Sequence, residues 1–323
     1  MSGKKDLRLV YTYDLDSRMS HSKIGKKIRM SQQLVNYKIK SFQEKEIILS
    51  AYPLIDYARF GYINFIVYFK INYMNKERFL DLIDKLWKEN DIVELTECGG
   101  RYDLISVFSS KNPSSFNKKL KELILRYPNQ LKNYLILTTV VSYYLPKSYL
   151  IKEDKNKQYI VIGGDREISE ITETDKKILF HLVQDCSKTI FDISKVVNVD
   201  PKTVINRIKK MRESEIIRGF KPLFDMQSLN VQTNKILLKY HNLSVEKEQE
   251  LVDFCIRNPN ITEITKVFGE WDLELTVETM EQKDFRSLYI ILNEKFQDII
   301  QDFDRFHVFK THKKTCLPQS FFE

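Results

Sequence analysis

The chain has 323 residues, of which 42% are hydrophobic and 12% aromatic, and its formal net charge is +8 at pH 7. It is longer than one ordinary domain needs and apolar enough for packed cores, which excludes a disordered chain. The longest nearly apolar run, residues 134–145, is too short to cross a bilayer, and no basic-then-apolar leader opens the sequence, so we expect a cytoplasmic protein without a membrane partner.

The positive charge is confined to two segments. Residues 1–50 hold 11 Lys and Arg against 5 Asp and Glu (net +6), and residues 171–221 hold 11 against 7 (net +4). The rest of the chain therefore sums to −2 (8 − 6 − 4). This distribution favours a polyanion as the partner of those two segments.

The first of these segments predicts three helices and a wing. Apolar residues at helical spacing place helices at residues 7–15 and 21–28. Ser31 is a good cap for a third helix, whose inward face carries Val35, Ile39 and Phe42. A short strand is expected at residues 46–49.

From Tyr62 onward the pattern changes to alternating helices and strands. β-Branched and aromatic runs predict strands at residues 62–71, 92–96, 102–108 and 131–145. Amphipathic patterns predict helices at residues 76–89 and 113–127. The order β-α-β-β-α-β is that of a ferredoxin-like domain, an antiparallel sheet with both helices on one face.

Residues 147–171 are charged, contain Gly163-Gly164 and predict a linker with a short strand at residues 159–162. A second basic pair of helices then follows. Ile193, Val196 and Val197 repeat at helical spacing, and the next helix opens with Asp200 as a side-chain cap and Pro201 in its first turn. Such a helical pair, apolar inside and cationic outside, suits a helix-turn-helix that enters a major groove.

The chain is a tandem duplication of one unit. Asp6 and Asp175 lie 169 residues apart (175 − 6), and the same offset takes Ile24 to Ile193 and the segment 100–104 (GRYDL) to 269–273 (GEWDL). The second unit accordingly predicts strands at residues 233–240, 261–267, 271–277 and 299–309, with helices at residues 245–257 and 282–296.

The expected fold class is α+β, a tandem repeat of a winged helix-turn-helix followed by a β-α-β-β-α-β ferredoxin-like domain. We expect five parts in chain order. They are a first winged helix-turn-helix (1–56), a first ferredoxin-like domain (57–146), a linker (147–170), a second winged helix-turn-helix (171–225) and a second ferredoxin-like domain (226–318).

This order of domains resembles the Lrp/AsnC family of transcription regulators. The residues that carry the resemblance are the helical segments KIGKKIRMSQQLVNYKIKSF and DISKVVNVDPKTVINRIKKM, the EII wings and the GRYDL and GEWDL turns. Two departures stand out: Glu46 and Glu215 replace the glycine usual before the wing isoleucines, and the chain carries two units where the family usually has one. The resemblance implies sequence-specific DNA binding, pairing and further assembly through the ferredoxin-like sheets, and modulation by an amino acid or other small effector.

The candidate DNA-binding residues lie on the outward face of the last helix of each helix-turn-helix, the recognition helix, and in the first unit also on the helix before it. Lys and Asn side chains match the donor and acceptor patterns of guanine and adenine, whereas other cations suit phosphates. The candidates are Lys23, Lys26, Lys27, Gln33, Asn36, Tyr37, Lys38 and Lys40 in the first unit, and Lys202, Thr203, Asn206, Arg207, Lys209 and Lys210 in the second. Because the two faces differ, an intrachain pseudo-dimer is expected to prefer a site with unlike halves. The alternative is that both are ordinary solvated helix faces.

The candidate effector-binding residues follow from the resemblance alone. They lie in the turns between the middle strands, namely Gly100, Tyr102 and Asp103 with Gly269, Trp271 and Asp272. The alternative is a structural turn in which glycine provides a positive φ, aspartate bonds backbone N–H groups and the aromatic ring packs.

Other chemistry finds little support. The four cysteines and five histidines show no metal-ligand or disulfide spacing, so neither a cofactor nor a metal is expected. Siroheme decarboxylases share this architecture, but they need histidine and arginine to hold a polycarboxylate macrocycle. Residues 51–62 hold Arg59 and no histidine, and residues 220–231 hold neither type. A partner protein that no longer binds DNA is the third alternative.

Overall fold

The computed structural model describes residues 3–72, 74–151, 158–241 and 244–323. The helices in those ranges are α1 (Lys4–Leu15), α2 (His21–Ile28), α3 (Gln32–Glu44), α4 (Lys76–Trp87), α5 (Pro113–Arg126), α6 (Glu173–Gln184), α7 (Ile190–Val197), α8 (Pro201–Glu213), α9 (Val245–Arg257) and α10 (Gln282–Lys295). The same ranges contain three short 3₁₀ turns, which follow strands, namely η1 (Tyr57–Phe60), η2 (Ser148–Leu150) and η3 (Gln319–Phe321).

The strands are β1 (Ile48–Ile55), β2 (Ile63–Ile71), β3 (Ile92–Gly99), β4 (Leu104–Ser110), β5 (Leu131–Tyr144), β6 (Ile160–Gly163), β7 (Ile217–Phe224), β8 (Gln232–Tyr240), β9 (Ile261–Gly269), β10 (Leu273–Thr279) and β11 (Ile300–Lys314). The predicted α+β class and the β-α-β-β-α-β order of each half are confirmed.

The two ferredoxin-like sheets close into one barrel. The strand order is β2-β4-β3-β11-β8-β10-β9-β5-β6, and an additional pairing of β2 with β5 joins the ends of the eight-stranded ring. The halves meet where Thr96 of β3 faces Thr311 of β11 and where Thr139 of β5 faces Val267 of β9. Closure leaves no exposed sheet edge in the ring, which removes the usual site of edge-to-edge aggregation.

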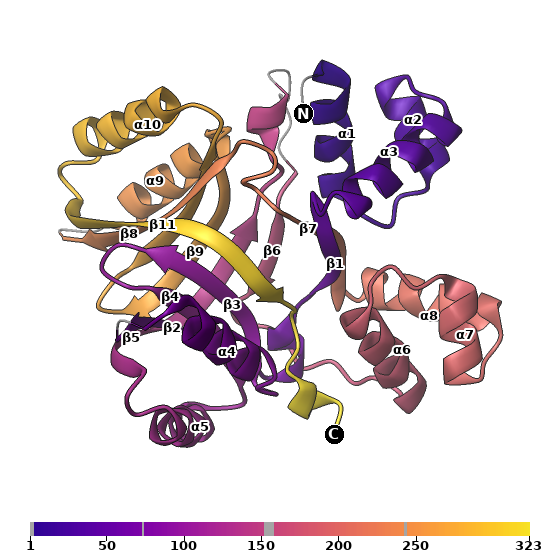
Figure 1. Ribbon diagram of the computed structural model, residues 1–323, viewed down its shortest axis with the longest axis horizontal. Coiled ribbons are helices and arrows are strands. Elements are labelled where there is room, and N and C mark those ends of the chain that lie inside the picture. Colours follow the sequence, from indigo (N-terminus) through magenta and orange to yellow (C-terminus); the bar gives the residue numbers. More distant parts are fainter. Residues whose placement is uncertain (1–2, 73, 152–157, 242–243) are drawn as a thin grey trace.

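Side chains of each barrel strand alternate between two cores. On β2, Phe65, Val67 and Phe69 pack outward with residues of α4 and α5. Tyr68 of the same strand points inward and contacts Phe306 of β11. Figure 1 shows the consequence, with α9 and α10 over one side of the barrel and α4 and α5 over the other.

The two helix-turn-helix units lie on the same side of the barrel and share a β-ribbon. Helices α1–α3 and α6–α8 form separate lobes, and the antiparallel strands β1 and β7 run between them (Figure 1). β1 is longer than the predicted wing at residues 46–49 because it pairs with β7 from the other half, Tyr52 opposite Lys221, a partner that local periodicity does not reveal.

The duplication extends to the backbone conformation. Positive φ occurs at Arg29 (57°) and Asn198 (58°), at Glu46 (54°) and Glu215 (59°), and at the pairs Gly61 with Asn230 and Gly100 with Gly269. Each pair is separated by 169 residues (198 − 29, 215 − 46, 230 − 61, 269 − 100). Glu46 and Glu215 thus adopt the left-handed conformation that glycine favours, which explains why glycine is usual there in the family.

Candidate nucleic-acid interface

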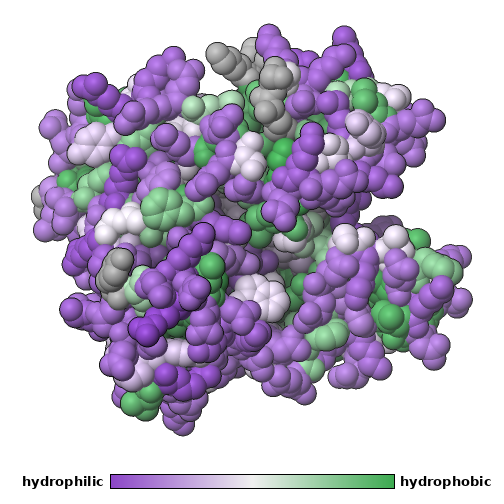
Figure 2. Space-filling view, viewed as in Figure 1, coloured by the Kyte–Doolittle hydropathy of each residue, from purple (hydrophilic) through white to green (hydrophobic). Residues whose placement is uncertain are grey.

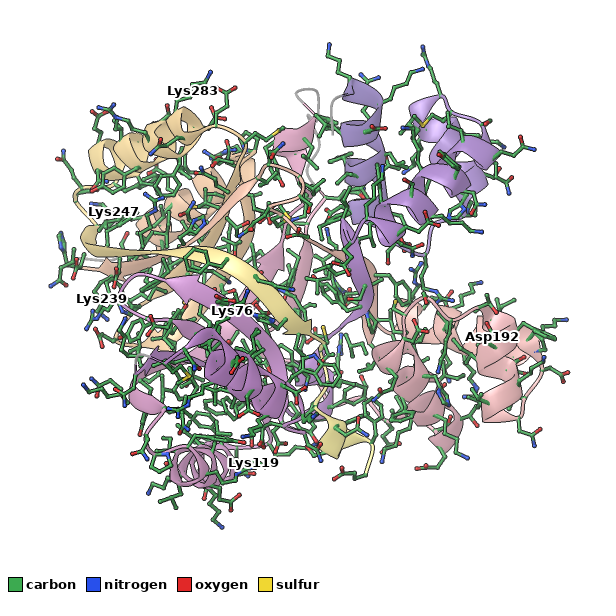
Figure 3. The ribbon with its side chains drawn as sticks, viewed as in Figure 1. Lys76, Lys119, Asp192, Lys239, Lys247 and Lys283 are labelled. Carbon is green, nitrogen blue, oxygen red and sulfur yellow. The ribbon has the colours of Figure 1, made fainter. Side chains whose placement is uncertain are left out.

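Side-chain caps fix the ends of the helices in both lobes. Ser31 accepts a hydrogen bond from the Leu34 N–H at the start of α3, as predicted. Thr189 and Asp192 form a reciprocal capping box at the start of α7. Figure 3 labels Asp192 in the lobe formed by α6–α8. The prediction that Asp200 caps α8 through its side chain is wrong, since Asp200 occupies the cap position but makes no such bond; Pro201 lies in the first turn as predicted.

The second recognition helix, α8, presents most of its predicted contacts to solvent. Lys202, Asn206, Lys209 and Lys210 are exposed, and Thr203 is half-buried beside them. Val204 and Met211 are buried on the opposite face. Ile205 is 52% exposed on the outer face and was not among the predicted contacts; such an apolar side chain suits a thymine methyl group.

The first recognition helix, α3, presents a different face. Gln33, Tyr37 and Lys40 are exposed, with Tyr37 70% exposed, while Asn36 is half-buried. The three lysines of α2 that precede this helix, Lys23, Lys26 and Lys27, are also exposed. The two faces therefore differ in chemistry although they occupy equivalent places. Figure 2 shows both lobes to be mainly hydrophilic on the side in view, with a notch between them.

Three of the predicted phosphate contacts form ion pairs inside their own lobes, of which the exposed Lys209–Glu213 pair (3.6 Å) lies within α8. Lys38 Nζ lies 2.5 Å from the Asp6 carboxylate, and Arg207 lies 3.3 Å from the Asp175 carboxylate. The Lys38 and Arg207 pairs are related by the 169-residue repeat (207 − 38 and 175 − 6), and each ties a recognition helix to the first helix of its lobe. Phosphate contact by Lys38 or Arg207 stays a prediction, and it would have to compete with these ion pairs.

The turns proposed for an effector lie at the barrel seams. Asp103 accepts a hydrogen bond from the Ile71 N–H at 2.8 Å, and Asp272 accepts one from the Tyr240 N–H at 2.8 Å. Tyr102 and Trp271 are buried inside the barrel. A Cβ at Gly100 would lie 3.3 Å from the Arg305 carbonyl oxygen, and one at Gly269 would lie 3.1 Å from that of Ile136. These contacts are those of the structural turn that the sequence left open as the alternative.

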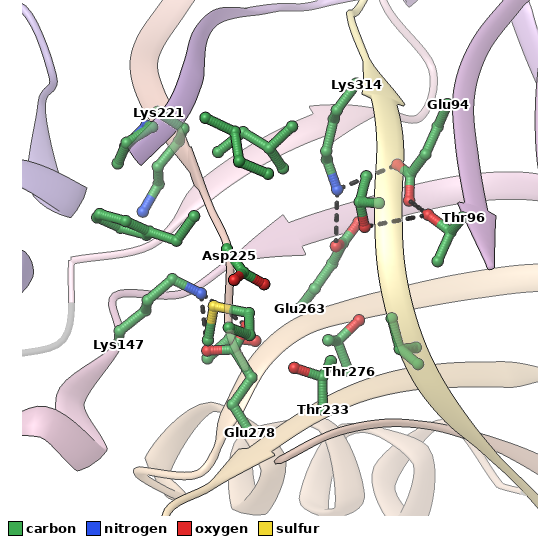
Figure 4. A pocket seen from close by; sticks show the side chains of 18 of the residues that line it. Glu94, Thr96, Lys147, Lys221, Asp225, Thr233, Glu263, Thr276, Glu278 and Lys314 are labelled. Atoms are coloured by element: carbon green, nitrogen blue, oxygen red, sulfur yellow. Dashed lines mark hydrogen bonds and ion pairs between the residues drawn. The ribbon is translucent and has the colours of Figure 1, made fainter. Parts of the chain in front are cut away.

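A charged cavity of about 120 Å³, which the sequence did not predict, lies between the barrel and the β1–β7 ribbon. Lys147 donates to both oxygens of the Glu278 carboxylate, at 2.6 and 2.7 Å. Lys314 lies 3.0 Å from Glu94 and 3.5 Å from Glu263 on the other wall (Figure 4). Alternating charged residues on strands look like a solvent-exposed face, and only barrel closure places them inside.

Burial and pairing act in opposite directions on the pKa values of this cluster. Burial disfavours the Lys314 ammonium, but Glu263 and Glu94 more than offset this and raise its pKa well above the ordinary value. Burial likewise disfavours the Glu263 carboxylate, but Lys314 and Lys235 prevail and lower its pKa. Lys314 and Glu263 are therefore held in their charged forms as a compensating pair at neutral pH.

The described residues contain no helix long and apolar enough to span a membrane. Nor do those ranges contain a group of three or more His, Cys, Asp or Glu placed to hold a metal ion.

Comparison with known proteins places the second lobe in a family. Residues 171–218 match the family described as winged helix-turn-helix DNA-binding. The HTH-type transcriptional regulator FL11 of Pyrococcus horikoshii is 26% identical over 148 residues, which are 45% of this chain and 93% of that protein. The transcriptional regulator AzlB of Bacillus subtilis is 25% identical over 146 residues, 45% of this chain and 92% of its own length. Less than half of this chain thus spans nearly a whole relative, as expected for a unit carried twice.

Over the full length, the fold is similar to that of the siroheme decarboxylase NirDL. That crystal structure aligns with 99% of this chain and 97% of its own at a TM-score of 0.59 and 11% identity, a likeness of fold alone. The matched DNA-binding domain, the transcription regulators among the relatives and the repeated domain order support the resemblance of this chain to Lrp/AsnC transcription regulators, with their unit present twice.

Proposed function

We propose that one chain acts as an intrachain pseudo-dimer that reads an asymmetric DNA site. The observation that supports this most is the single β1–β7 ribbon, which joins two recognition helices with unlike exposed faces. The strand pairs at both barrel seams fix the same relation between the halves. A homodimer of identical units reads a palindrome, whereas one chain with two different faces reads two different half-sites.

On α8, we assign base contacts to Lys202, Thr203 and Asn206, and phosphate contacts to Lys209 and Lys210. On α3, Gln33, Asn36 and Tyr37 are the base-reading candidates, with Lys40 and the α2 lysines toward phosphates. Both sets rest on position and exposure on the recognition helices.

Salt dependence of binding tests this function. In an electrophoretic shift with genomic fragments, log K should fall with log salt by about 0.9 for each phosphate that is neutralised. The double variant Lys209→Ala/Lys210→Ala should reduce that slope by nearly two units. Lys283→Ala is the control, because Lys283 lies on α10 across the barrel from the lobes (Figure 3). A flat salt dependence of the wild-type protein would rule out DNA as the ligand.

The full-length fold match makes siroheme decarboxylation the second candidate. The lining of the barrel cavity argues against it. Among the described residues, neither histidine nor arginine lines this cavity. The lysines that line it are accompanied by carboxylates, which disfavour a polycarboxylate ligand. A space of about 120 Å³ is also small for a macrocycle. Absence of any spectral change in the Soret region when siroheme is added would close this alternative.

Assembly beyond one chain belongs to the same proposal, with a second copy as the occupant. Tyr289, Ile290 and Ile291 on α10 are 40–43% exposed, an apolar surface on the outside of the barrel. Sedimentation equilibrium should show an oligomer that Ile291→Lys weakens. A monomer at all concentrations would remove this part of the proposal.

A further inference from the structure

The two lobes touch each other directly through the loops that follow their first helices. One loop joins α1 to α2 over residues 16–20, and the other joins α6 to α7 over residues 185–189. The loops are equivalent in the repeat, because 185 − 16 is 169. Arg18 of the first loop donates to the carbonyl oxygens of Cys186 and Lys188 in the second, at 2.6 and 2.9 Å. This loop contact joins the lobes without using the barrel or the pairing of β1 with β7.

The loop contact lies about the pseudo-twofold axis of the molecule. A residue faces its own repeat equivalent only where that axis passes, as Tyr52 faces Lys221 in the ribbon (221 − 52 = 169). Two equivalent loops that meet each other must likewise lie about the axis. A contact at this place constrains both lobes equally, since neither lobe can leave it without moving away from the other.

A carboxylate and an aromatic ring support the arginine. The Arg18 N–H donates to Asp16 Oδ1 at 3.0 Å, and Asp16 Oδ2 accepts from Arg212 of α8 at 3.0 Å. Both guanidinium groups lie over the ring of the buried Phe220 of β7, with Cζ 5.4 Å (Arg18) and 4.9 Å (Arg212) from its centroid. The Ser17 N–H donates to the Phe220 carbonyl oxygen at 3.0 Å. The first loop is therefore held against the second half of the chain by several contacts that support one another.

The side chains of this contact are specific to their own half. Three of them differ at the repeat equivalents, namely Arg18 with Ser187, Arg212 with Gln43 and Phe220 with Ala51. Ser187 stays within its own loop, where its hydroxyl donates to Asp185 at 2.5 Å. The fold of a lobe does not need the arginine, because the second lobe forms with a serine in its place.

We infer that Arg18 sets the separation of the two recognition helices, and with it the spacing between half-sites that one chain accepts. The joining of the lobes does not depend on DNA. The consequence for half-site spacing rests on the proposed function and names a residue that determines its specificity. Arg18 acts as a positioning residue, since it acts through the placement of α3 and α8 and no base or phosphate contact is assigned to it.

The bonds of Arg18 are of a kind that can hold two small lobes together. A hydrogen bond from a charged donor stabilises a protein more than one between neutral groups. Arg18 is half-buried, so water competes with its acceptors less than it would at an open surface. Removal of the side chain also leaves the carbonyl oxygens of Cys186 and Lys188 without this donor. The lobes should then separate far more often.

Distances between spin labels on the two lobes test the loop contact without DNA. Glu44 and Glu213 are exposed repeat equivalents at the ends of α3 and α8, so Glu44→Cys/Glu213→Cys places one label on each lobe. Cys186 is replaced by serine in every sample, and the other three native cysteines are buried. The parent protein should give one narrow distribution. Arg18→Ala should broaden it, because the population of separated lobes rises by about tenfold or more. An unchanged width would overturn the inference.

Two further variants separate this role from a general loosening of the loops. Ser187→Ala changes the equivalent position in the second loop and should leave the distribution as it is in the parent. Asp16→Asn keeps the size of the side chain but removes the charge that pairs with Arg212, and it should broaden the distribution less than Arg18→Ala does. Equal broadening by Ser187→Ala and Arg18→Ala would contradict a specific role of Arg18.

Selection from a randomised duplex pool tests the consequence for DNA. The parent chain should enrich two half-sites at one spacing, whereas Arg18→Ala should enrich the same half-sites at several spacings. If Arg18 acted on stability alone, the variant would bind more weakly at the single parental spacing, and that result would disprove its role in specificity. Label distances that broaden in Arg18→Ala, with no DNA enriched by either protein, would instead count against the proposed function alone.

Discussion

The two halves of this chain are alike in backbone and unlike in the surfaces that meet other molecules. Positive φ recurs at the same repeat positions, and the Lys38–Asp6 pair reappears as Arg207–Asp175. The outward residues of α3 and α8 differ, and so do the inward residues of the central barrel strands. The halves agree in the residues that set the backbone geometry, and they have diverged in the residues that point outward from the recognition helices and inward into the barrel. This pattern is expected if duplication provided a scaffold on which two surfaces specialised separately.

The largest loss of stability is expected at a residue that forms ion pairs with both halves. Lys314 pairs with Glu94 and with its repeat equivalent Glu263. Lys314→Met leaves the mostly buried Glu94 without a cation and Glu263 with Lys235 alone, and the free energy of unfolding should fall by about 3 kcal/mol. Urea denaturation measures it, with Lys283→Met as an exposed control. A loss below about 1 kcal/mol would show that the cluster is solvated.

The next effect concerns the reading faces. Asn206→Ala should weaken DNA binding by about 1–3 kcal/mol and relax the base preference in one half-site only. Tyr37→Ala should act on the other half-site. Site selection from a randomised duplex pool, repeated with each variant, measures both. Identical changes in the two selected motifs would contradict separate roles.

A smaller difference is expected between the twin ion pairs. Asp175 also completes the capping box of α6 with Thr172, whereas the N-cap residue of α1 is Gly3, which has no side chain to cap the helix. Asp175→Ala should therefore cost about 1–2 kcal/mol of stability and Asp6→Ala less than about 1 kcal/mol. Thermal denaturation of the two variants provides the comparison, and equal losses would show that the cap contributes nothing.

Substitutions at the turns before the two wing strands are expected to increase the stability of the protein. Glu46→Gly relieves a left-handed glutamate and should stabilise the protein by about 0.5 kcal/mol after the entropy of glycine is counted. Glu215→Gly should gain less, because Glu215 pairs with Arg218 and with Arg59. Denaturation curves of both variants decide it, and a larger gain at Glu215 would contradict this account of the turns.

The pH dependence of the cavity pairs gives the smallest signal. The pKa of Glu263 is lower in the folded chain than in the unfolded chain, so its contribution to stability is present at neutral pH and is lost as the pH falls below about 4.5 toward the folded pKa. The stability difference between wild type and Glu263→Gln should therefore shrink on acidification. A constant difference from pH 7 to 4 would mean that the carboxylate is not held by its lysines.

Local periodicity predicted nearly all elements, and what it missed depends on contacts between the halves. The helix expected at residues 245–257 is α9, residue for residue. In contrast, β1 and β11 extend beyond the expected 46–49 and 299–309, since each pairs with a strand of the other half. Closure of the barrel also buries Glu94, Glu263 and Lys314. Each of them alternates with other residues along its own strand, a pattern that is typical of a strand face exposed to solvent. Sequence patterns also could not predict the ion pairs of Lys38 with Asp6 and of Arg207 with Asp175. Each pair depends on how two helices pack within one lobe.

The central claim is that one chain reads two unlike half-sites held at a fixed separation. Selection from a randomised duplex pool, at chain concentrations too low for assembly, tests it most directly. The account predicts a motif with two different halves at one spacing, of which Asn206→Ala degrades one and Tyr37→Ala the other. A perfect palindrome, or no enriched motif, would contradict it.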